Sequence, residues 1–178
     1  MKSLDLDLDQ HELEVALSKK RVDCAVHSLK DLPVELRDGL AVAAVLERED
    51  PREVLVINPV TVADGFASLP SGSRVGTSSV RRRAQVLSHR RDLEPVELRG
   101  SVPSRLRKVE TGMVHAAILS ADSLLRLGAG TRITQYLDAP DWIPAAGQGA
   151  VAVEIRSDDE RMREMLSPLD HLEYDALT

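Results

Sequence analysis

The chain has 178 residues, of which 43% are apolar and only 2% aromatic, with one cysteine and a formal net charge of −6 at pH 7. The single cysteine excludes an internal disulfide, no apolar run approaches the roughly 20 residues of a membrane span, and the first residues do not resemble a secretory signal. We therefore expect a cytoplasmic globular protein with no membrane contact, and we expect no metal site.

Short apolar segments alternate with helical patterns along the chain. Strands are expected over residues 22–26, 40–46, 53–57, 95–98, 114–119 and 150–155, because each is short and apolar. Helices are expected around 13–17 and over 80–89, 102–110, 121–127 and 158–166. Alternating strands and helices predict an α/β fold whose sheets are covered by helices on both faces.

The first polar motif, VHSLKDLP from Val26, directly follows an expected buried strand. Pro33 biases the residue before it away from helical geometry, so the polar side chains are expected on a loop at the strand end. Ligands of open α/β sheets bind at such carboxyl ends. In isolation, Lys30 and Asp31 could equally form an ordinary solvated pair, and His27 could be a hydrogen-bonded, partly buried histidine.

The second motif, GTSSVRR from Gly76, follows a short expected strand at Arg74-Val75 and leads into the expected helix 80–89. A glycine turn, hydroxyl groups near the helix N-cap and the amides of the first helical turn favour an anion. Arg81 and Arg82 oppose the helix dipole there, so they destabilise the helix unless a negative group compensates. This conflict with the local rule indicates a functional position.

The third motif, RGSVPSRLRK from Arg99, repeats the arrangement after the next strand. Two successive junctions of this kind should lie side by side at one edge of a sheet. They belong to a stretch, 74–108, that holds ten basic and three acidic residues in an otherwise acidic chain. A solvated helix surface and a nucleic-acid groove are the alternatives, and the acidity and scarcity of aromatic residues weaken the second. We favour a pocket for polyanions.

Two further segments are less specific. The small residues of IPAAGQGA, 143–150, favour a packing or hinge role over chemistry. The polar segment REDPR, 48–52, suits a crossover between domains or an ordinary loop.

Together these segments resemble porphobilinogen deaminase (hydroxymethylbilane synthase), in the order and spacing of that family. The matching pieces are VHSLKDLP from Val26, EREDPRE from Glu47, GTSSVRR from Gly76, RGSVPSRLRK from Arg99, AAILSADSLLRLG from Ala116 and PAAGQGAVAVEIR from Pro144. The resemblance covers roughly residues 12–156, and residues 1–10 are expected to fall outside it.

The resemblance implies a two-lobed fold, like that of periplasmic binding proteins, with mixed sheets and an active site between the lobes. Residues 1–51 would form part of domain 1, residues 52–145 domain 2, and residues 146–178 a return to domain 1 that leads toward a third domain. We expect the family's amino-terminal strand and its third domain, which carries the cofactor cysteine, to have no counterpart in this chain.

The resemblance also implies an activity in tetrapyrrole (haem) biosynthesis. The family condenses four porphobilinogen molecules with release of ammonia, on a dipyrromethane cofactor that is attached to a cysteine. By the motif match Asp31 would be catalytic, and the residues that bind cofactor and substrate would be Ser28, Lys30, Thr77, Ser78, Ser79, Arg81, Arg82, Arg99, Gly100 and Arg105. The substitution Arg82→Ala is expected to weaken binding of carboxylated pyrroles more than it alters stability.

Cys24 is not expected to replace the missing cofactor cysteine, because it falls within the apolar segment 22–26 and is interpreted as a buried structural thiol. The chain could be a fragment, a short gene product that needs a complementing chain, or an inactive relative. Self-association through an exposed face of domain 1 is a further hypothesis. The alternative function is that of a catalytically inactive two-lobed module that binds carboxylated small molecules.

Overall fold

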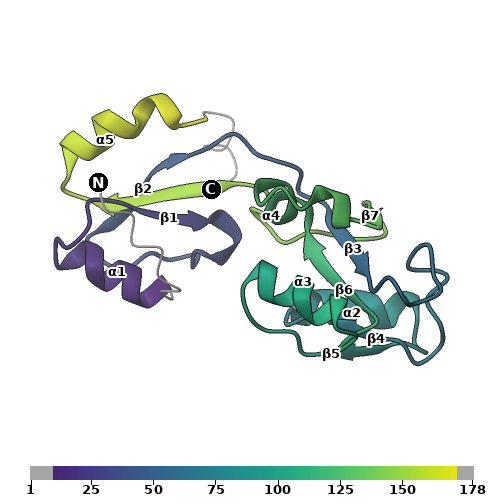
Figure 1. Cartoon of the computed structure of the whole chain (residues 1–178). Coiled ribbons are helices and arrows are strands. Elements are labelled where there is room, and N and C mark those ends of the chain that lie inside the picture. Colours follow the sequence, from purple (N-terminus) through teal and green to yellow (C-terminus); the bar gives the residue numbers. More distant parts are fainter. Residues whose placement is uncertain (1–9, 172–178) are drawn as a thin grey trace. The chain divides into compact units, whose positions relative to one another are not determined.

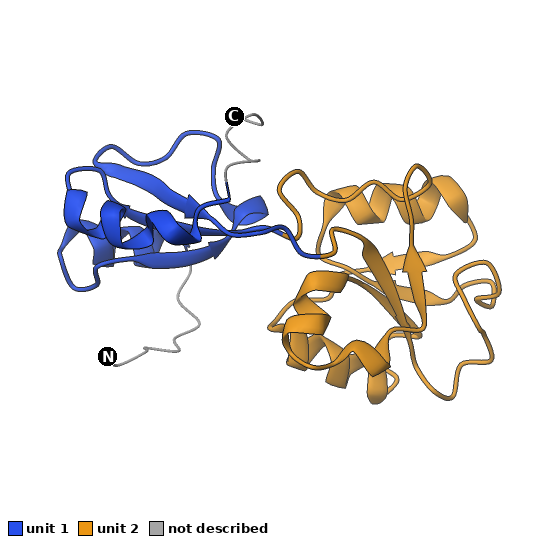
Figure 2. Cartoon of the chain, turned by 90° about the horizontal axis from the view of Figure 1, so that it is seen from above, with its two compact units in different colours: residues 1–49, 150–178 blue, residues 50–149 orange. Residues whose placement is uncertain are grey.

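A computed structural model describes residues 10–171, which belong to two compact units (Figure 2). Unit 1 comprises Met1–Glu49 and Ala150–Thr178, and unit 2 comprises Asp50–Gly149. Unit 2 is therefore an insertion between the two segments of unit 1. The sequence places these crossings after residues 51 and 145, within a few residues of the observed bounds.

Unit 1 is a three-stranded sheet between two helices. The central strand pairs antiparallel with both neighbours, in the order β1-β8-β2. The helices α1 and α5 lie on opposite faces of this sheet (Figure 1). The elements are α1 (Gln10–Ser18), β1 (Ala25–Ser28), the 3-10 turn η1 (Leu29–Asp31), β2 (Leu40–Val45), β8 (Val151–Arg156), α5 (Glu160–Leu166) and η3 (Ser167–Leu169).

Unit 2 is a five-stranded mixed sheet in the order β5-β4-β6-β3-β7. Strand β4 runs parallel to β5 and β6, whereas β3 runs antiparallel to β6 and β7. The elements are β3 (Glu53–Ile57), β4 (Arg74–Gly76), α2 (Val80–His89), β5 (Glu94–Val96), α3 (Val102–Glu110), β6 (Ala116–Ser120), α4 (Ala121–Arg126), η2 (Gly130–Arg132) and β7 (Gln135–Leu137).

The residues of β3 explain why unit 2 needs helices on both faces. All five residues of this strand are buried. Leu55 and Ile57 pack in one apolar cluster with Val86 of α2, while Val54 and Val56 pack in another with side chains of α3 and α4. Neighbouring residues of a strand point to opposite faces, so an apolar run such as this one requires cover on each side. The α/β class expected from the sequence is confirmed.

The first expected strand is displaced. It runs over Ala25–Ser28 instead of 22–26, so Cys24 precedes the strand and is partly exposed, not buried within it. Residues 1–9, for which the sequence analysis expects no family similarity, lie outside the described residues. Along 10–171, no helix is long and apolar enough to cross a membrane.

Candidate functional site

The junction between β4 and α2 has the geometry of a capped helix. Ser79 occupies the N-cap in an extended conformation, and its Oγ accepts a hydrogen bond from the amide of Arg82 at 3.4 Å. Thr77 is buried, and its Oγ1 accepts from the amide of Ser79 at 3.1 Å. Both hydroxyl groups are thus fixed by backbone contacts, and each keeps its own hydrogen to donate. Ser78, between them, is exposed.

The two arginines of the first turn of α2 have different surroundings. Arg82 is 7% exposed, and its Nη2 lies 2.7 Å from Oε2 of Glu53. The Arg81 side chain is 29% exposed, and it donates to Oε1 of Glu53 and to the carbonyl oxygen of Ile143, both at 2.5 Å. Arg81 therefore reaches solvent while Arg82 is held inside the protein.

This difference revises one expectation. Because Arg82 is buried against a carboxylate, its loss would leave a buried charge with one partner fewer, which is strongly destabilising. Substitution of Arg82 should therefore affect stability at least as much as binding. The sequence alone does not distinguish the two arginines, because a pattern of residue types does not show which one faces the core.

The junction between β5 and α3 turns on Gly100, whose φ of +113° is a conformation that side chains rarely adopt. The carbonyl oxygen of Gly100 accepts from Nε of Arg105 at 2.6 Å, and that of Arg99 accepts from Nζ of Lys108 at 2.7 Å. The Arg99 side chain is 81% exposed and forms an ion pair with Glu97. Arg99 thus presents its charge at the surface, whereas Arg105 supports the turn.

The two junctions lie next to each other. Strands β4 and β5 are parallel neighbours, with Gly76 opposite Val96 at their carboxyl ends. The amide of Thr77 donates to the carbonyl oxygen of Val96 at 2.9 Å, which extends the pairing into the first junction. The expectation that these two basic junctions are side by side is confirmed.

A polar loop of unit 1 follows β1, but His27 and Ser28, which the sequence places on the loop, belong to the strand itself. Ser28 ends the strand, Lys30 and Asp31 form the 3-10 turn η1, and Leu32 is extended before the proline. The Asp31 side chain is exposed, and no residue among 10–171 forms an ion pair or hydrogen bond with it. Its carboxylate is available to a ligand.

Two buried ionisable side chains lie on β1, just before this loop, and on the neighbouring strand β8. Nε2 of His27 lies 3.2 Å from Oε2 of Glu154, and the two side chains are 5% and 0% exposed. Burial raises the pKa of Glu154 above its ordinary value, the neighbouring Glu14 raises it further, and His27 acts in the opposite direction. The amide of Leu29 donates to the carbonyl oxygen of Ala150 at 2.9 Å, so the loop is tied to the start of β8.

Cys24 does not have the surroundings of a reactive thiol. Burial and the charge of Asp23 both raise the pKa of Cys24. A raised pKa keeps the thiol protonated at neutral pH, and the thiolate is the nucleophilic form.

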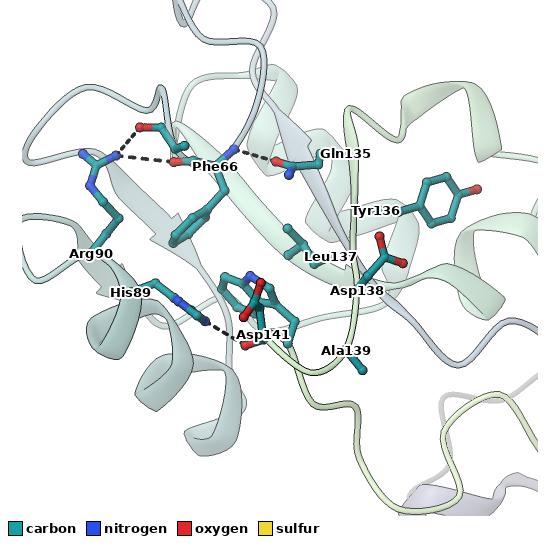
Figure 3. A pocket seen from close by; sticks show the side chains of 11 residues that line it. Phe66, His89, Arg90, Gln135, Tyr136, Leu137, Asp138, Ala139 and Asp141 are labelled. Carbon is teal, nitrogen blue, oxygen red and sulfur yellow. Dashed lines mark hydrogen bonds between the residues drawn. The ribbon is translucent and has the colours of Figure 1, made fainter.

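A cavity of about 440 Å³ lies elsewhere in unit 2 (Figure 3). It is lined by Phe66, His89, Tyr136 and Trp142 among others, and none of the residues predicted from the motifs lines it. Phe66 and Trp142 meet edge to face, and the rings of His89 and Trp142 are stacked. These rings belong to the core under the 135–142 segment, so we interpret the cavity as a feature of packing. Among the described residues, no group of His, Cys, Asp and Glu side chains could hold a metal ion.

Comparison with known proteins gives a clear result. The family model described as porphobilinogen deaminase, dipyromethane cofactor binding domain, matches residues 5–164.

The chain belongs to the porphobilinogen deaminase family.

The porphobilinogen deaminase of Xanthomonas campestris pv. campestris (strain B100) is 50% identical over 159 residues, which cover 89% of this chain and 51% of the relative. That of Syntrophobacter fumaroxidans is 49% identical over 158 residues, which cover 89% of this chain and 50% of the relative. The chain spans about half the length of the curated relatives it matches. Because the family match begins at residue 5, the expectation that all of residues 1–10 differ from the family is wrong.

Several of the similar solved structures are of binding proteins. A putative methionine-binding lipoprotein of Bacillus subtilis covers 92% of this chain, and 76% of its own chain is matched, with a TM-score of 0.62 and 13% identity. A periplasmic binding protein of Salmonella typhimurium has a TM-score of 0.53 and 14% identity, with 92% of this chain and 71% of that chain covered. At such identities the likeness shows the fold alone. The periplasmic-binding-protein-like fold implied by the resemblance is confirmed.

Two residues near the predicted site are not predicted from the sequence. Glu53 and Glu154 are fully buried carboxylates that contact Arg81, Arg82 and His27. The only signal that could have found them is an acidic residue inside an apolar strand, where an unpaired charge would be costly.

Proposed function

We propose that this chain supplies substrate- and cofactor-binding units of a hydroxymethylbilane synthase, which acts in tetrapyrrole biosynthesis. The observation that carries the proposal is the pair of adjacent basic junctions in unit 2, in a chain 50% identical to a porphobilinogen deaminase. Each porphobilinogen has an acetate and a propionate side chain, so a growing pyrrole chain is a polycarboxylate. Arginine suits such ligands because its planar guanidinium can donate two parallel hydrogen bonds to one carboxylate.

The predicted binding residues differ in their exposure and contacts, and we infer different roles for them. Arg81 and Arg99 reach solvent and would bind carboxylates directly. The buried Arg82 would raise the local positive potential, and Arg105 and Gly100 would maintain the second turn. The hydroxyl groups of Thr77, Ser78 and Ser79 would donate to the same anions. In unit 1, Ser28 and Lys30 would bind substrate beside Asp31.

Asp31 would act as the catalytic carboxylate. Loss of ammonia from porphobilinogen leaves an electron-poor ring, and the ring that attacks it passes through a positively charged state. A carboxylate held near the pyrrole nitrogens stabilises this positive charge more in the transition state than in the ground state. The exposure of Asp31 and its lack of a partner among residues 10–171 support this role.

The donor set of unit 2 also fits a dipyrromethane, which bears the same carboxylate side chains as the substrate. Arg81, Arg99 and the hydroxyl groups of the first junction are the residues that would hold it. When bound, this group supplies the first pyrrole acceptor and anchors the product during elongation. The surroundings of Cys24 do not support attachment there.

We further propose that the protein works in the cytoplasm, which the single cysteine and the biosynthetic role of the family support. Self-association through unit 1 is supported by Val26, which is 62% exposed on β1, an outer strand of the sheet that residues 10–171 form in this unit. Sedimentation at micromolar concentration tests it, because a monomer alone would contradict self-association.

A chimeric enzyme tests the proposed activity. Residues 12–156 of this chain would replace the matching part of the Xanthomonas campestris relative, and conversion of porphobilinogen would be measured. We expect ammonia release and hydroxymethylbilane formation, and loss of both with Asp31→Asn. A folded chimera that carries its cofactor and does not consume porphobilinogen would contradict the proposal. The inactive binding module is not favoured, because the similar relatives are named as deaminases.

A further inference from the structure

Glu53 is a carboxylate without access to solvent at the start of β3. Its backbone lies inside the sheet, opposite Ser120 of β6 on one side and Leu137 of β7 on the other. An ionised carboxylate in such a place is strongly unfavourable unless cations compensate it. The first turn of α2 provides the cations.

Each oxygen of Glu53 contacts a different arginine. Oε1 accepts from Nη2 of Arg81 at 2.5 Å, and Oε2 lies 2.7 Å from Nη2 of Arg82. Nη1 of Arg82 also donates to the carbonyl oxygen of Ile118 at 3.2 Å, deep in the sheet. Glu53 therefore bridges a buried guanidinium and one that reaches solvent.

The position of Arg81 is defined by two acceptors on different elements. One is Glu53, and the other is the carbonyl oxygen of Ile143. Ile143 is itself held by Gln85, whose side-chain amide accepts from the Ile143 amide at 2.6 Å and donates to its carbonyl oxygen at 3.2 Å. A long side chain fixed in this way has already lost the rotamer freedom that binding would otherwise remove.

The charges of Glu53, Arg81 and Arg82 do not cancel. Two guanidinium groups and one carboxylate leave one positive charge, and Arg81 is the member through which it meets solvent. The positive end of the α2 dipole lies at the same place. The site formed by these three side chains and the N-terminus of α2 therefore favours the binding of one further negative group.

We propose that Glu53 is a positioning residue for this anion site, and the proposal rests on the function proposed above. Its carboxylate holds Arg81 in the orientation that receives a carboxylate of a pyrrole substrate, although its own charge repels that substrate. Positioning of Arg81 strengthens substrate binding, whereas the negative charge of Glu53 weakens it. If Glu53 only neutralised charge, its removal would strengthen anion binding; because it positions Arg81, its removal weakens binding.

The test compares four forms of the whole chain: wild type, Glu53→Gln, Glu53→Asp and Glu110→Gln. Glu53→Gln removes the charge, while Glu53→Asp keeps it but is too short by one methylene to bridge both arginines. Glu110→Gln is the matched control, because it removes one charge from an ion pair with Arg132 elsewhere in unit 2. If Glu53→Gln does not fold, as thermal unfolding would show, Glu53→Asp decides the question.

Two measurements are made on the folded proteins. The first is the affinity for porphobilinogen by calorimetry, where we expect Glu53→Gln and Glu53→Asp to bind about tenfold more weakly and Glu110→Gln to bind as wild type does. The second is the nuclear magnetic resonance signal of the arginine side chains, which separates when rotation of a guanidinium is hindered. We expect hindered rotation of Arg81 in wild type and Glu110→Gln, and free rotation in Glu53→Gln.

Equal or tighter binding by Glu53→Gln, or Arg81 signals that do not change, would overturn the proposal. Failure of every form, wild type included, to bind porphobilinogen would count against the proposed function. In that case the arginine signals still decide whether Glu53 positions Arg81.

Discussion

His27 and Glu154 lie diagonally across the antiparallel strands β1 and β8, with Nε2 of the histidine 3.2 Å from Oε2 of the glutamate. His27 is opposite Ala152, two residues before Glu154, so both side chains point to the same face of the sheet. That face also carries Glu14 of α1, which accepts a hydrogen bond from Gln10 at 2.8 Å. His27, Glu154 and Glu14 thus form a buried cluster of ionisable groups, and His27 lies on the strand that leads into the loop with Asp31.

This cluster makes the stability of the chain depend on pH. The pKa of Glu154 is raised in the folded protein, chiefly by burial, so the folded state holds this proton more tightly than the unfolded state. Its contribution to stability is complete below the ordinary value near 4.5 and is lost as pH rises through the raised value. We expect Glu154→Gln to remove this loss, so that its stability relative to wild type increases as the pH rises above about 4.5.

Urea unfolding at intervals of pH measures this difference. Glu164→Gln, which changes an exposed glutamate of α5, is the control and should follow wild type throughout. Parallel curves for wild type and Glu154→Gln would show that Glu154 does not titrate differently in the folded state.

The buried ion pair of Arg82 should dominate the stability of unit 2. We expect Arg82→Ala to lower the free energy of unfolding by about 3–5 kcal/mol, because it removes one of the two cations that compensate the buried Glu53. Arg83→Ala alters the next residue, which is exposed, and should change stability by less than about 0.5 kcal/mol. Chemical denaturation of both variants tests this, and equal losses would refute the assignment.

Asp31 should matter for the reaction and not for folding. In the chimeric enzyme, Asp31→Asn should reduce turnover by at least about 10²–10³-fold, the scale of one lost transition-state contact. The side chain is exposed, so the melting temperature should stay close to that of the parent. Asp38→Asn, which changes another exposed aspartate of unit 1, should leave turnover unchanged. Normal turnover by Asp31→Asn would exclude a catalytic role.

We expect any side chain at position 100 to destabilise the turn. Its φ of +113° disfavours other residues, and an added Cβ would lie 3.0 Å from Oγ of Ser104. We expect Gly100→Ala to cost about 1–3 kcal/mol in the free energy of unfolding. Ser101→Ala, at the adjoining N-cap, should cost little, because its side chain forms no capping hydrogen bond. A larger loss from Ser101→Ala than from Gly100→Ala would contradict this reading of the turn.

The sequence predicts the regular elements well where periodicity and capping agree. The helices 80–89 and 102–110 and the strand 53–57 are found with the expected bounds, because each begins or ends at a clear polar or glycine boundary. The short strand Gln135–Leu137 was not expected, since three residues give no periodic signal and its place depends on pairing with β3.

The sequence predicts which residues form the candidate site, but it does not predict which residues they contact. The motifs place Thr77, Arg81 and Arg99 at junctions between a strand and a helix, which follows from local sequence. The partner of Arg81 lies 28 residues earlier in the chain, and only the pairing of β3 within the sheet brings Glu53 beneath α2. A contact between residues so far apart in the chain depends on tertiary packing, so no local sequence pattern predicts it.

A calorimetric titration of porphobilinogen into the whole chain and into Arg81→Gln, with Arg83→Gln as the control, tests the proposed anion site. Arg81 is the partly exposed guanidinium of the anion site, whereas Arg83 is exposed outside it. We predict saturable binding by wild type and Arg83→Gln, and affinity at least about tenfold weaker for Arg81→Gln. Equal affinity of all three proteins, or no binding by any of them, would contradict the central claim that unit 2 binds the carboxylates of porphobilinogen.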